Sequence, residues 1–175
     1  MHVLQVVIND KDDCKKYNQG VQHNQYLAFA LMKLVGIAIK QKKRGEMLLL
    51  QSVNLGREFG LKGDYRGRPG KRQVTVLSQD SWADACRFLD VDLPWTTRRA
   101  NLLIDSRAFS RDDLGRIISI GDARLQITRE TDPCGRMDDA SYGLKEALQP
   151  DWRGGVCCRV KQEGLIQIGL NVEIS

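Results

Sequence analysis

The sequence has 175 residues, of which 42% are hydrophobic and 28% are charged, and its net charge is +5. This balance is that of one globular domain and excludes a largely disordered chain. The apolar run over 27–39 contains Lys33 and is too short to cross a bilayer, so we expect no membrane segment. The five cysteines form no C-x-x-C pair and no secreted disulfide framework, and no signal peptide is recognisable, so we expect a cytoplasmic protein.

The first 33 residues differ from the rest of the chain. Residues 3–8 are largely aliphatic and fit a short strand, residues 9–24 are polar and irregular, and residues 26–32 fit a helical turn or two. We predict an N-terminal extension over 1–33, in part disordered, followed by one β-barrel domain over 34–175. Both histidines of the chain lie in the extension.

From Val35 onward the sequence predicts many short strands that are separated by glycine-containing turns. The predicted strands are 35–39, 47–53, 74–77, 101–104, 117–120, 124–129, 156–161 and 165–168. Short strands at such frequent intervals are typical of a barrel or a sandwich and not of a βαβ fold.

Two helices are predicted to interrupt these strands. Apolar side chains recur at i, i+3, i+4 and i+7 over 82–89, and Ser78 or Asp80 is available as the N-cap. The same spacing recurs over 140–148, with two aspartates before it and a proline just beyond it.

The most informative segment, 131–136, presents a cysteine on a turn directly after a predicted strand. Pro133 cannot donate to a strand ladder, and Gly135 allows the backbone to turn away, so Cys134 is expected at the rim of the sheet. Arg136 is close enough in sequence to favour the thiolate, which is the form that attacks electrophiles and binds metals. The alternative is a thiol that merely packs at the end of a strand.

The other cysteines have simpler interpretations. Cys86 belongs to the apolar face of the first helix and is expected in the core. Because neighbouring side chains of a strand point to opposite faces, Cys158 is expected on the buried face and Cys157 toward solvent or a pocket. Cys14 lies in the extension.

Basic residues are concentrated in several short segments. Lysines and arginines cluster over 40–44 and 66–72, Arg98 and Arg99 precede a predicted strand, and 153–155 form an amide-rich Arg-Gly-Gly turn. Such clusters suit a phosphate-bearing ligand or nucleic acid, and the alternative is an ordinary solvated surface.

The sequence lacks the residues and motifs on which several classes of enzyme depend. With no histidine after residue 23, a Cys-His hydrolase and a multi-histidine metal site are unsupported. No phosphate-binding loop of the Walker type occurs, and the glycines over 56–63 have the wrong spacing for a dinucleotide fingerprint. A thiolate would therefore have to act alone, by attacking, by carrying sulfur or by binding a soft metal.

Five elements, in this order along the chain, resemble motifs of the MOSC family, which is named for the C-terminal domain of molybdenum cofactor sulfurase. They are Leu61-Lys62-Gly63-Asp64-Tyr65, Arg72-Gln73-Val74-Thr75-Val76-Leu77, Arg98-Arg99-Ala100-Asn101-Leu102, Ile120-Gly121-Asp122-Ala123 with Pro133-Cys134-Gly135-Arg136, and Arg153-Gly154-Gly155-Val156 with Arg159-Val160 and Gly164. They extend over about 35–174, which is most of the chain. The sequence departs from the family in having no histidine in this part and in following Gly169 with Leu170 where an aspartate is common.

The resemblance implies a mainly β, barrel-like domain with about two short peripheral helices. It also implies binding of the molybdenum cofactor, molybdopterin, and either sulfur transfer or reduction of N-hydroxylated compounds. Cys134 would then ligate molybdenum or carry sulfur, and Asp132 and Arg136 would tune and position its thiol. The residues that would contact the cofactor are Arg66, Arg68, Arg98, Arg99, Asn101, Arg153, Gly154 and Gly155.

A stand-alone domain of this kind would need a partner protein that supplies sulfur or electrons. Two other interpretations remain open from the sequence. One is a basic β-barrel module for nucleic acid without catalysis, although an aromatic content of 6% supplies few side chains for base stacking. The other is a family member that acts only in assembly and does not take up the cofactor.

Overall fold

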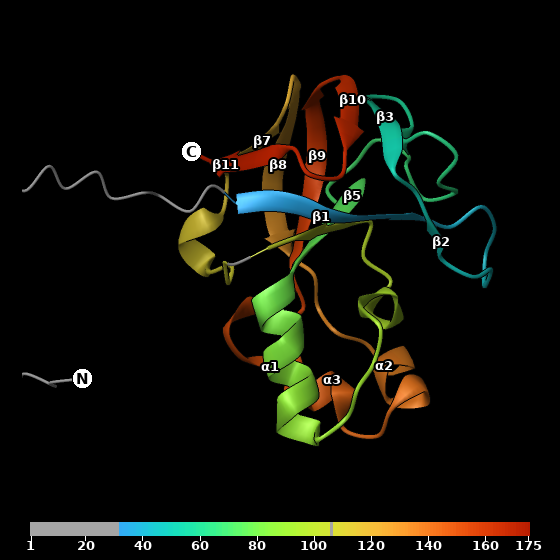
Figure 1. Ribbon diagram of the computed structural model, residues 1–175, viewed down its shortest axis with the longest axis vertical. Helices are drawn as coiled ribbons and strands as arrows, with labels where there is room; N and C mark the ends of the chain where they lie inside the picture. The colour runs from blue at the N-terminus through green and yellow to red at the C-terminus, as the bar shows by residue number, and fades with distance from the viewer. Residues whose placement is uncertain (1–31, 106) are drawn as a thin grey trace, which may run out of the picture.

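Seven strands close into a barrel in the computed structural model, which describes residues 32–105 and 107–175 (Figure 1). Around the barrel the strands follow the order β1, β6, β5, β9, β8, β7 and β11, and β11 pairs with β1 to complete the closure. All of these pairs are antiparallel except the parallel pair β5–β6. The strands are β1 (Met32–Ile39), β5 (Val74–Ser78), β6 (Leu102–Ile104), β7 (Ile117–Ile120), β8 (Ala123–Glu130), β9 (Val156–Gln162) and β11 (Asn171–Ile174). The predicted mainly β barrel is confirmed.

Four shorter strands complete the β-structure. β2 (Leu48–Leu49) pairs with the end of β1, while β3 (Ser52–Gly56), β4 (Gly60–Leu61) and β10 (Gly164–Gln167) form a separate three-stranded sheet. The single strand predicted over 47–53 is therefore two strands that belong to different sheets. The sequence also did not predict β4 and β11, because the first has only two residues and the second follows a glycine turn directly.

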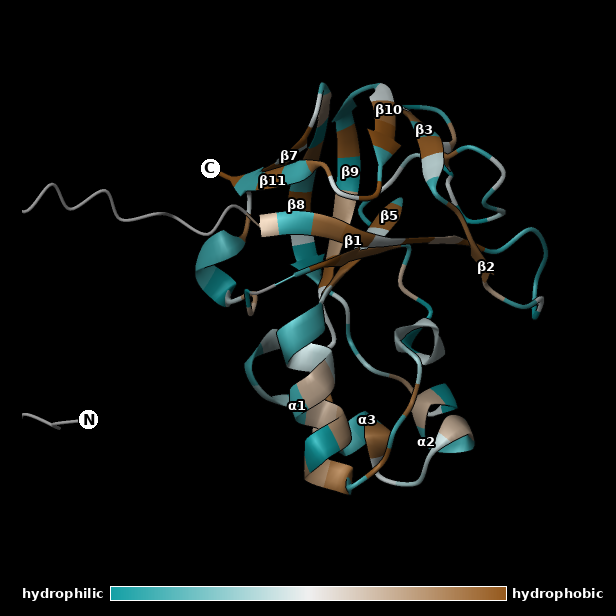
Figure 2. Ribbon diagram, in the orientation of Figure 1, coloured by the Kyte–Doolittle hydropathy of each residue, from teal (hydrophilic) through white to brown (hydrophobic). Residues whose placement is uncertain are grey.

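Hydrophobic side chains fill the inside of the barrel. In β8, Leu125 and Ile127 are fully buried while Arg124, Gln126 and Thr128 on the other face are partly exposed, as the period-two pattern predicts. β1 becomes continuously hydrophobic toward its C-terminal half, where it is buried on both faces (Figure 2). The barrel therefore has a packed core, and any ligand site must lie outside it.

Three short α-helices gather at one end of the barrel (Figure 1). They are α1 (Gln79–Leu89), α2 (Arg136–Ala140) and α3 (Leu144–Ala147), and the 3-10 turns are η1 (Trp95–Arg98), η2 (Arg111–Asp113) and η3 (Pro150–Trp152). A second core, which includes Leu77 and Leu103 of the barrel and Trp82 of α1, joins the helices to the strands. The second predicted helix is wrong as one element: Ser141 is extended and Gly143 is left-handed (φ 81°), so α2 and α3 are separate.

The N-cap of α1 is Ser78, one of the two residues that the sequence offered for this role. Its side chain accepts a hydrogen bond from the backbone N–H of Ser81 at 3.2 Å. We expect Ser78→Ala to lower the free energy of unfolding by about 1 kcal/mol, measured by urea denaturation. Asp80→Ala is the control, because Asp80 lies in the first turn and not at the cap, and an equal loss in both variants would contradict the assignment.

The predicted boundary between extension and domain stays a prediction. The strand expected over 3–8 and residues 26–31 of the helical turn expected over 26–32 lie outside the described residues. Met32, the last residue of that turn, forms the start of β1 together with Lys33. In the part of the chain that the structure describes, no helix is long and apolar enough to cross a membrane.

Candidate active site

Cys134 lies outside the barrel, on the segment that joins β8 to α2. β8 ends at Glu130, Thr131 is buried, and Cys134 is exposed. The carbonyl of Cys134 accepts a hydrogen bond from the backbone N–H of Met137 at 2.8 Å, which closes the turn into α2. The prediction of an exposed thiol on a turn after a strand is confirmed.

The Cys134 side chain opens into a cavity of about 220 Å³ that is lined mainly by arginines. Its other lining residues are Arg66, Arg72, Arg98, Arg99, Arg136 and Met137. Two neighbouring cavities share part of this lining, one of them with a volume of about 540 Å³. They add the basic residues Lys40 and Arg44 and the acidic residues Asp64 and Asp139. We call the three cavities together the basic cleft.

One cavity of the basic cleft is lined by the connection between β1 and β2, by η1 with the arginine that follows it, and by α2. Seven of its lining side chains are basic and two are acidic. A concave surface with this charge raises the local concentration of anions. The arrangement therefore brings a reachable thiol together with a site suited to a negatively charged ligand.

Arg98 is buried beneath the thiol cavity and holds two loops together. Its Nε donates to the carbonyl of Gly154 at 2.9 Å and its Nη2 to the carbonyl of Thr131 at 2.6 Å. Burial, and to a smaller extent Arg72, lowers the pKa of Arg98 to about 10, so the side chain is a cation at neutral pH. Because its Nε and Nη2 donate to the carbonyls of Gly154 and Thr131, Arg98 fixes the position of the segment that leads from Thr131 to Cys134.

Arg99 points into the basic cleft and lines all three of its cavities. Its backbone is left-handed (φ 63°), which ends η1 and separates the half-buried Arg99 from the buried Arg98. Burial, followed by the neighbouring charges of Arg66 and Arg136, lowers the pKa of Arg99. Crowding of this kind among cations is relieved when an anion binds between them.

A network of hydrogen bonds forms one wall of the cleft around Asn101. The Nδ2 of Asn101 donates to Asp64 Oδ2 at 2.7 Å and to the carbonyl of Ala38 at 3.2 Å, while its Oδ1 accepts from the Thr75 hydroxyl at 2.9 Å. Asp64 Oδ1 accepts from the backbone N–H of Arg66 at 2.7 Å. The network fixes the backbone of the segment that carries Arg66.

Several predicted site residues do not line the basic cleft. Arg68 is exposed, Asp132 forms an ion pair with Arg129 at 3.3 Å, and the Nη1 of Arg153 donates to the carbonyl of Ala147 at 3.4 Å. Gly154 and Gly155 are buried. A Cβ at Gly154 would lie 2.5 Å from the carbonyl oxygen of Thr131, and a Cβ at Gly155 would lie 2.3 Å from that of Val76, so the two glycines allow close packing against the Thr131 loop and against β5, respectively.

The other described cysteines are buried. Cys86 lies in the second core as predicted, and burial strongly raises the pKa of Cys158. Cys157 is fully buried, so the expectation that it faces solvent is wrong. Its thiol lies 3.2 Å from the hydroxyl of Thr131, because the segment after β8 covers this face of β9.

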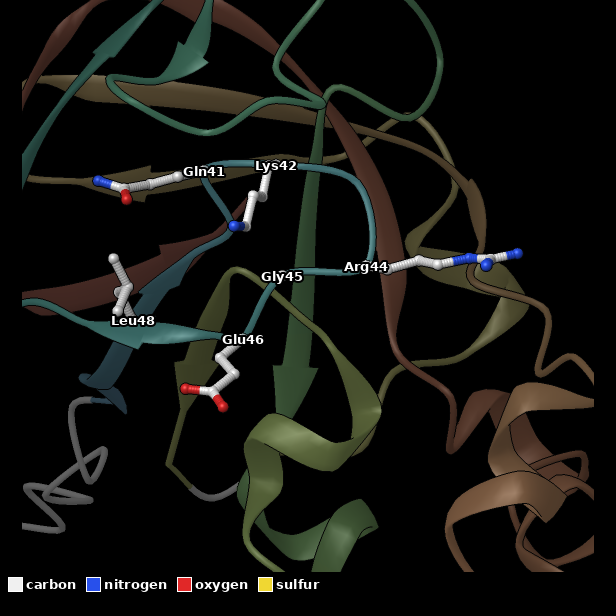
Figure 3. Close-up of a pocket in the computed structure, with 6 residues that line it drawn as sticks. All are labelled: Gln41, Lys42, Arg44, Gly45, Glu46 and Leu48. Carbon is white, nitrogen blue, oxygen red and sulfur yellow. The ribbon is translucent and has the colours of Figure 1, made fainter.

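A separate hollow of about 470 Å³ lies in the connection between β1 and β2 (Figure 3). Lys42, Arg44 and Leu48 line it, and the side chain of Arg44 extends away from the other labelled residues (Figure 3). Arg44 also lines the cavity that contains Arg99 and Arg136. The hollow adjoins the basic cleft at Arg44 and Gly45, which line both, whereas Lys42 lines none of the three cavities of the cleft.

Sequence reasoning did not single out Lys40, Arg72 or Met137 as individual site residues. The signal for Lys40 was its position directly after the apolar residues 34–39, which places it at the end of β1. Within 32–105 and 107–175, no group of three or more histidine, cysteine, aspartate or glutamate side chains could hold a metal ion. A metal at Cys134 would accordingly need its other ligands from a cofactor.

Comparisons with known proteins agree with this architecture. The fold resembles that of YuaD from Bacillus subtilis, with a TM-score of 0.68, 18% identity, and coverage of 82% of this chain and 95% of that chain. It also resembles YiiM from Geobacillus stearothermophilus (TM-score 0.66, 18% identity, 82% and 75% coverage) and YiiM from Escherichia coli (TM-score 0.62, 16% identity, 82% and 69% coverage).

Among proteins with curated functions, none matches this chain. The family model of the MOSC domain matches residues 40–173, which include six of the seven barrel strands at least in part and the whole of the Cys134 segment, and β1 ends directly before the match. A match over more than half of the chain, together with the barrel and the exposed cysteine after β8, makes the assignment clear. The chain belongs to the MOSC domain family.

Proposed function

We propose that this protein binds the molybdenum cofactor in the basic cleft, in the cytoplasm, with the Cys134 thiolate as a ligand to molybdenum. The observation that carries the proposal is one exposed thiol that opens into a cavity lined by five arginines. A thiolate is the soft ligand that such a metal favours, and guanidinium groups suit the phosphate of the pterin. The residues present therefore fit the chemistry of this cofactor.

Each part of the cleft would have a separate task. Cys134 would hold the metal, while Arg66, Arg72, Arg99 and Arg136 would bind the phosphate and orient the pterin. Arg98 would hold the Cys134 segment in place through its two carbonyl contacts. When bound, the cofactor supplies two-electron redox chemistry, and this suits reduction of an N-hydroxylated compound. The electrons would come from a partner redox protein.

Sulfur carriage at Cys134 is the second candidate, and the exposure of the thiol favours it. A sulfur carrier must present its persulfide to a donor and an acceptor, and an exposed turn allows both approaches. In this case the partner would be a sulfur-donor protein. Mass spectrometry of the isolated protein separates the two candidates, because a persulfide adds the mass of one sulfur atom to Cys134.

We expect protein purified without oxygen, from cells that make the cofactor, to retain molybdenum and pterin. Replacing Arg66 and Arg99 together by glutamine should lower this retention by on the order of tenfold or more, because each charge-assisted contact is worth roughly 1.5–3 kcal/mol. The measurement is molybdenum and pterin content per chain after dialysis. Arg159→Gln is the control, because Arg159 is an exposed residue of β9 that does not line the basic cleft. Wild-type protein with no molybdenum, no pterin and no persulfide would contradict the proposal.

A further inference from the structure

We infer that the α-helical end of the molecule binds a partner protein that presents basic side chains, with Tyr142 as the aromatic anchor of the contact. The surface consists of Phe88 and the side chains around a hollow beside α2 and α3, and we call it the docking surface. Binding at this surface does not depend on the cofactor. The partner's task, to supply electrons or sulfur, rests on the proposed function.

The hollow lies outside the basic cleft and has a volume of about 410 Å³. It is lined by α2, by α3 and by the residues that connect and follow them, namely Asp138, Tyr142, Gly143, Lys145, Glu146 and Gln149. None of these residues lines the three cavities of the basic cleft. The hollow is therefore a second concave surface, separate from the thiol.

Tyr142 is an exposed aromatic residue on a fixed backbone. It is 95% exposed, whereas Leu144, two residues later, is fully buried in the second core. The backbone N–H of Ser141 donates to the carbonyl of Met137 at 3.0 Å, and that of Leu144 donates to the carbonyl of Ser141 at 3.1 Å. Because its backbone is already fixed, Tyr142 loses little conformational freedom when a partner covers it, and tyrosine often dominates the binding energy of interfaces.

A second exposed aromatic residue adjoins the same contact between helices. Phe88, near the end of α1, is 68% exposed. The next residue, Leu89, packs against Gly143, which follows Tyr142: a Cβ at Gly143 would lie 3.2 Å from Leu89 Cδ2. Two exposed aromatic residues next to one contact, beside a hollow, are typical of a surface that binds another protein.

The charge of the α-helical end identifies the kind of partner. Segments 79–93 and 135–149 carry seven acidic and three basic side chains, although the whole chain has a net charge of +5. In the lining of the hollow, neither Asp138 nor Glu146 forms an ion pair with a described residue. Acidic side chains repel the phosphates of nucleic acids and of anionic lipids, and they attract basic proteins. The occupant that fits is therefore a protein with a basic surface.

α2 connects the docking surface to the thiol. The helix begins two residues after Cys134. Its residues Asp139 and Ala140 line the cavity of about 540 Å³ in the basic cleft, whereas Asp138 lines the hollow. A partner in the hollow would be separated from the cleft by about 10 Å, the diameter of one helix. A donor bound there would contact the helix that follows Cys134 and would leave the mouth of the cleft open.

Photo-crosslinking in cells that make this protein tests the surface and identifies the partner. The photoreactive residue p-benzoylphenylalanine replaces Tyr142 or Phe88 in the full chain. The control replaces Leu165, which is exposed on β10 at the opposite end of the molecule (Figure 1). We expect positions 142 and 88, but not 165, to crosslink to the same basic protein. A nucleic acid, an acidic protein, a second copy of this chain, or no common product would overturn the inference.

The affinity of the purified partner then tests each feature, by fluorescence anisotropy at low ionic strength. We expect Tyr142→Ala to weaken binding by about tenfold or more and Glu146→Lys by on the order of tenfold. Asp122→Lys, a charge reversal on the turn between β7 and β8, is the control and should change the affinity less than about twofold. Equal affinities for Glu146→Lys and Asp122→Lys, or wild-type affinity in Tyr142→Ala, would overturn the docking surface.

Further measurements separate this result from misfolding and from the proposed function. Because Tyr142 and Glu146 are exposed, both variants should keep thermal midpoints within about 3 °C of the wild type. A larger fall in Tyr142→Ala would show that Tyr142 stabilises the fold and is not a docking anchor. Both variants should also keep the wild-type content of molybdenum and pterin.

Cys134→Ser should bind the partner as tightly as the wild type. Loss of binding in Cys134→Ser would place the partner at the thiol and would overturn the docking surface. Wild-type protein that binds the partner through Tyr142 and Glu146 but contains no molybdenum, pterin or persulfide would contradict the proposed function and support the docking surface.

Discussion

Replacing Cys134 by serine is expected to lower cofactor-dependent turnover more than about 100-fold. The reason is that Cys134 supplies the one thiol in the lining of the cavity, and a serine hydroxyl stays protonated and binds a soft metal poorly. Because Cys134 is exposed, the free energy of unfolding should change by less than about 0.5 kcal/mol. Turnover of an N-hydroxylated compound with an artificial electron donor, and urea unfolding of the same samples, provide the measurements.

The control for this variant is Cys86→Ala, which removes a thiol from the buried face of α1, at a residue that does not line the basic cleft. It should lower stability and keep turnover, the reverse of Cys134→Ser. If the two variants lost turnover to the same degree, the role assigned to Cys134 would be wrong.

Replacing Arg98 by methionine is expected to lower the free energy of unfolding by about 2–4 kcal/mol, because the carbonyls of Thr131 and Gly154 would each lose a buried hydrogen-bond donor. Arg98→Lys should recover only part of this loss, since one ammonium group cannot reproduce the geometry of two guanidinium nitrogens. Urea unfolding measures the effect.

Arg99→Met is the matched control, because the neighbouring arginine is half-buried and directed into the cleft. It should change stability by less than about 1 kcal/mol and should weaken ligand binding. An Arg98→Met protein as stable as Arg99→Met would show that the two carbonyl contacts contribute little.

The strands were predictable from the sequence because their side chains follow the period of the pleat. β7 and β8 were predicted almost to the residue, since Ile118, Ile120, Leu125 and Ile127 alternate with polar residues. The second helix was predicted as one element because its apolar spacing continues across 141–143. The backbone breaks there at an extended serine and a left-handed glycine, and the apolar pattern alone contains no sign of this.

The candidate site was only partly predictable, because burial depends on contacts between distant segments. Cys134 was identified from its turn, but Arg98 and Arg99 look alike in sequence. Arg98 packs closely against the distant Gly154, where a Cβ would lie 3.0 Å from Arg98 Nη2, and it donates to the carbonyl of that glycine. Likewise Cys157 is buried because the segment of Thr131 folds over β9. Periodicity within one strand cannot reveal what covers its outer face.

The central claim is that the sulfur of Cys134 binds the cofactor metal, and X-ray absorption at the molybdenum edge tests it most directly. Wild-type protein and Cys134→Ser, each loaded with the cofactor, should differ by one sulfur ligand to molybdenum, with one fewer in the variant. The same number of sulfur ligands in both proteins would contradict the account.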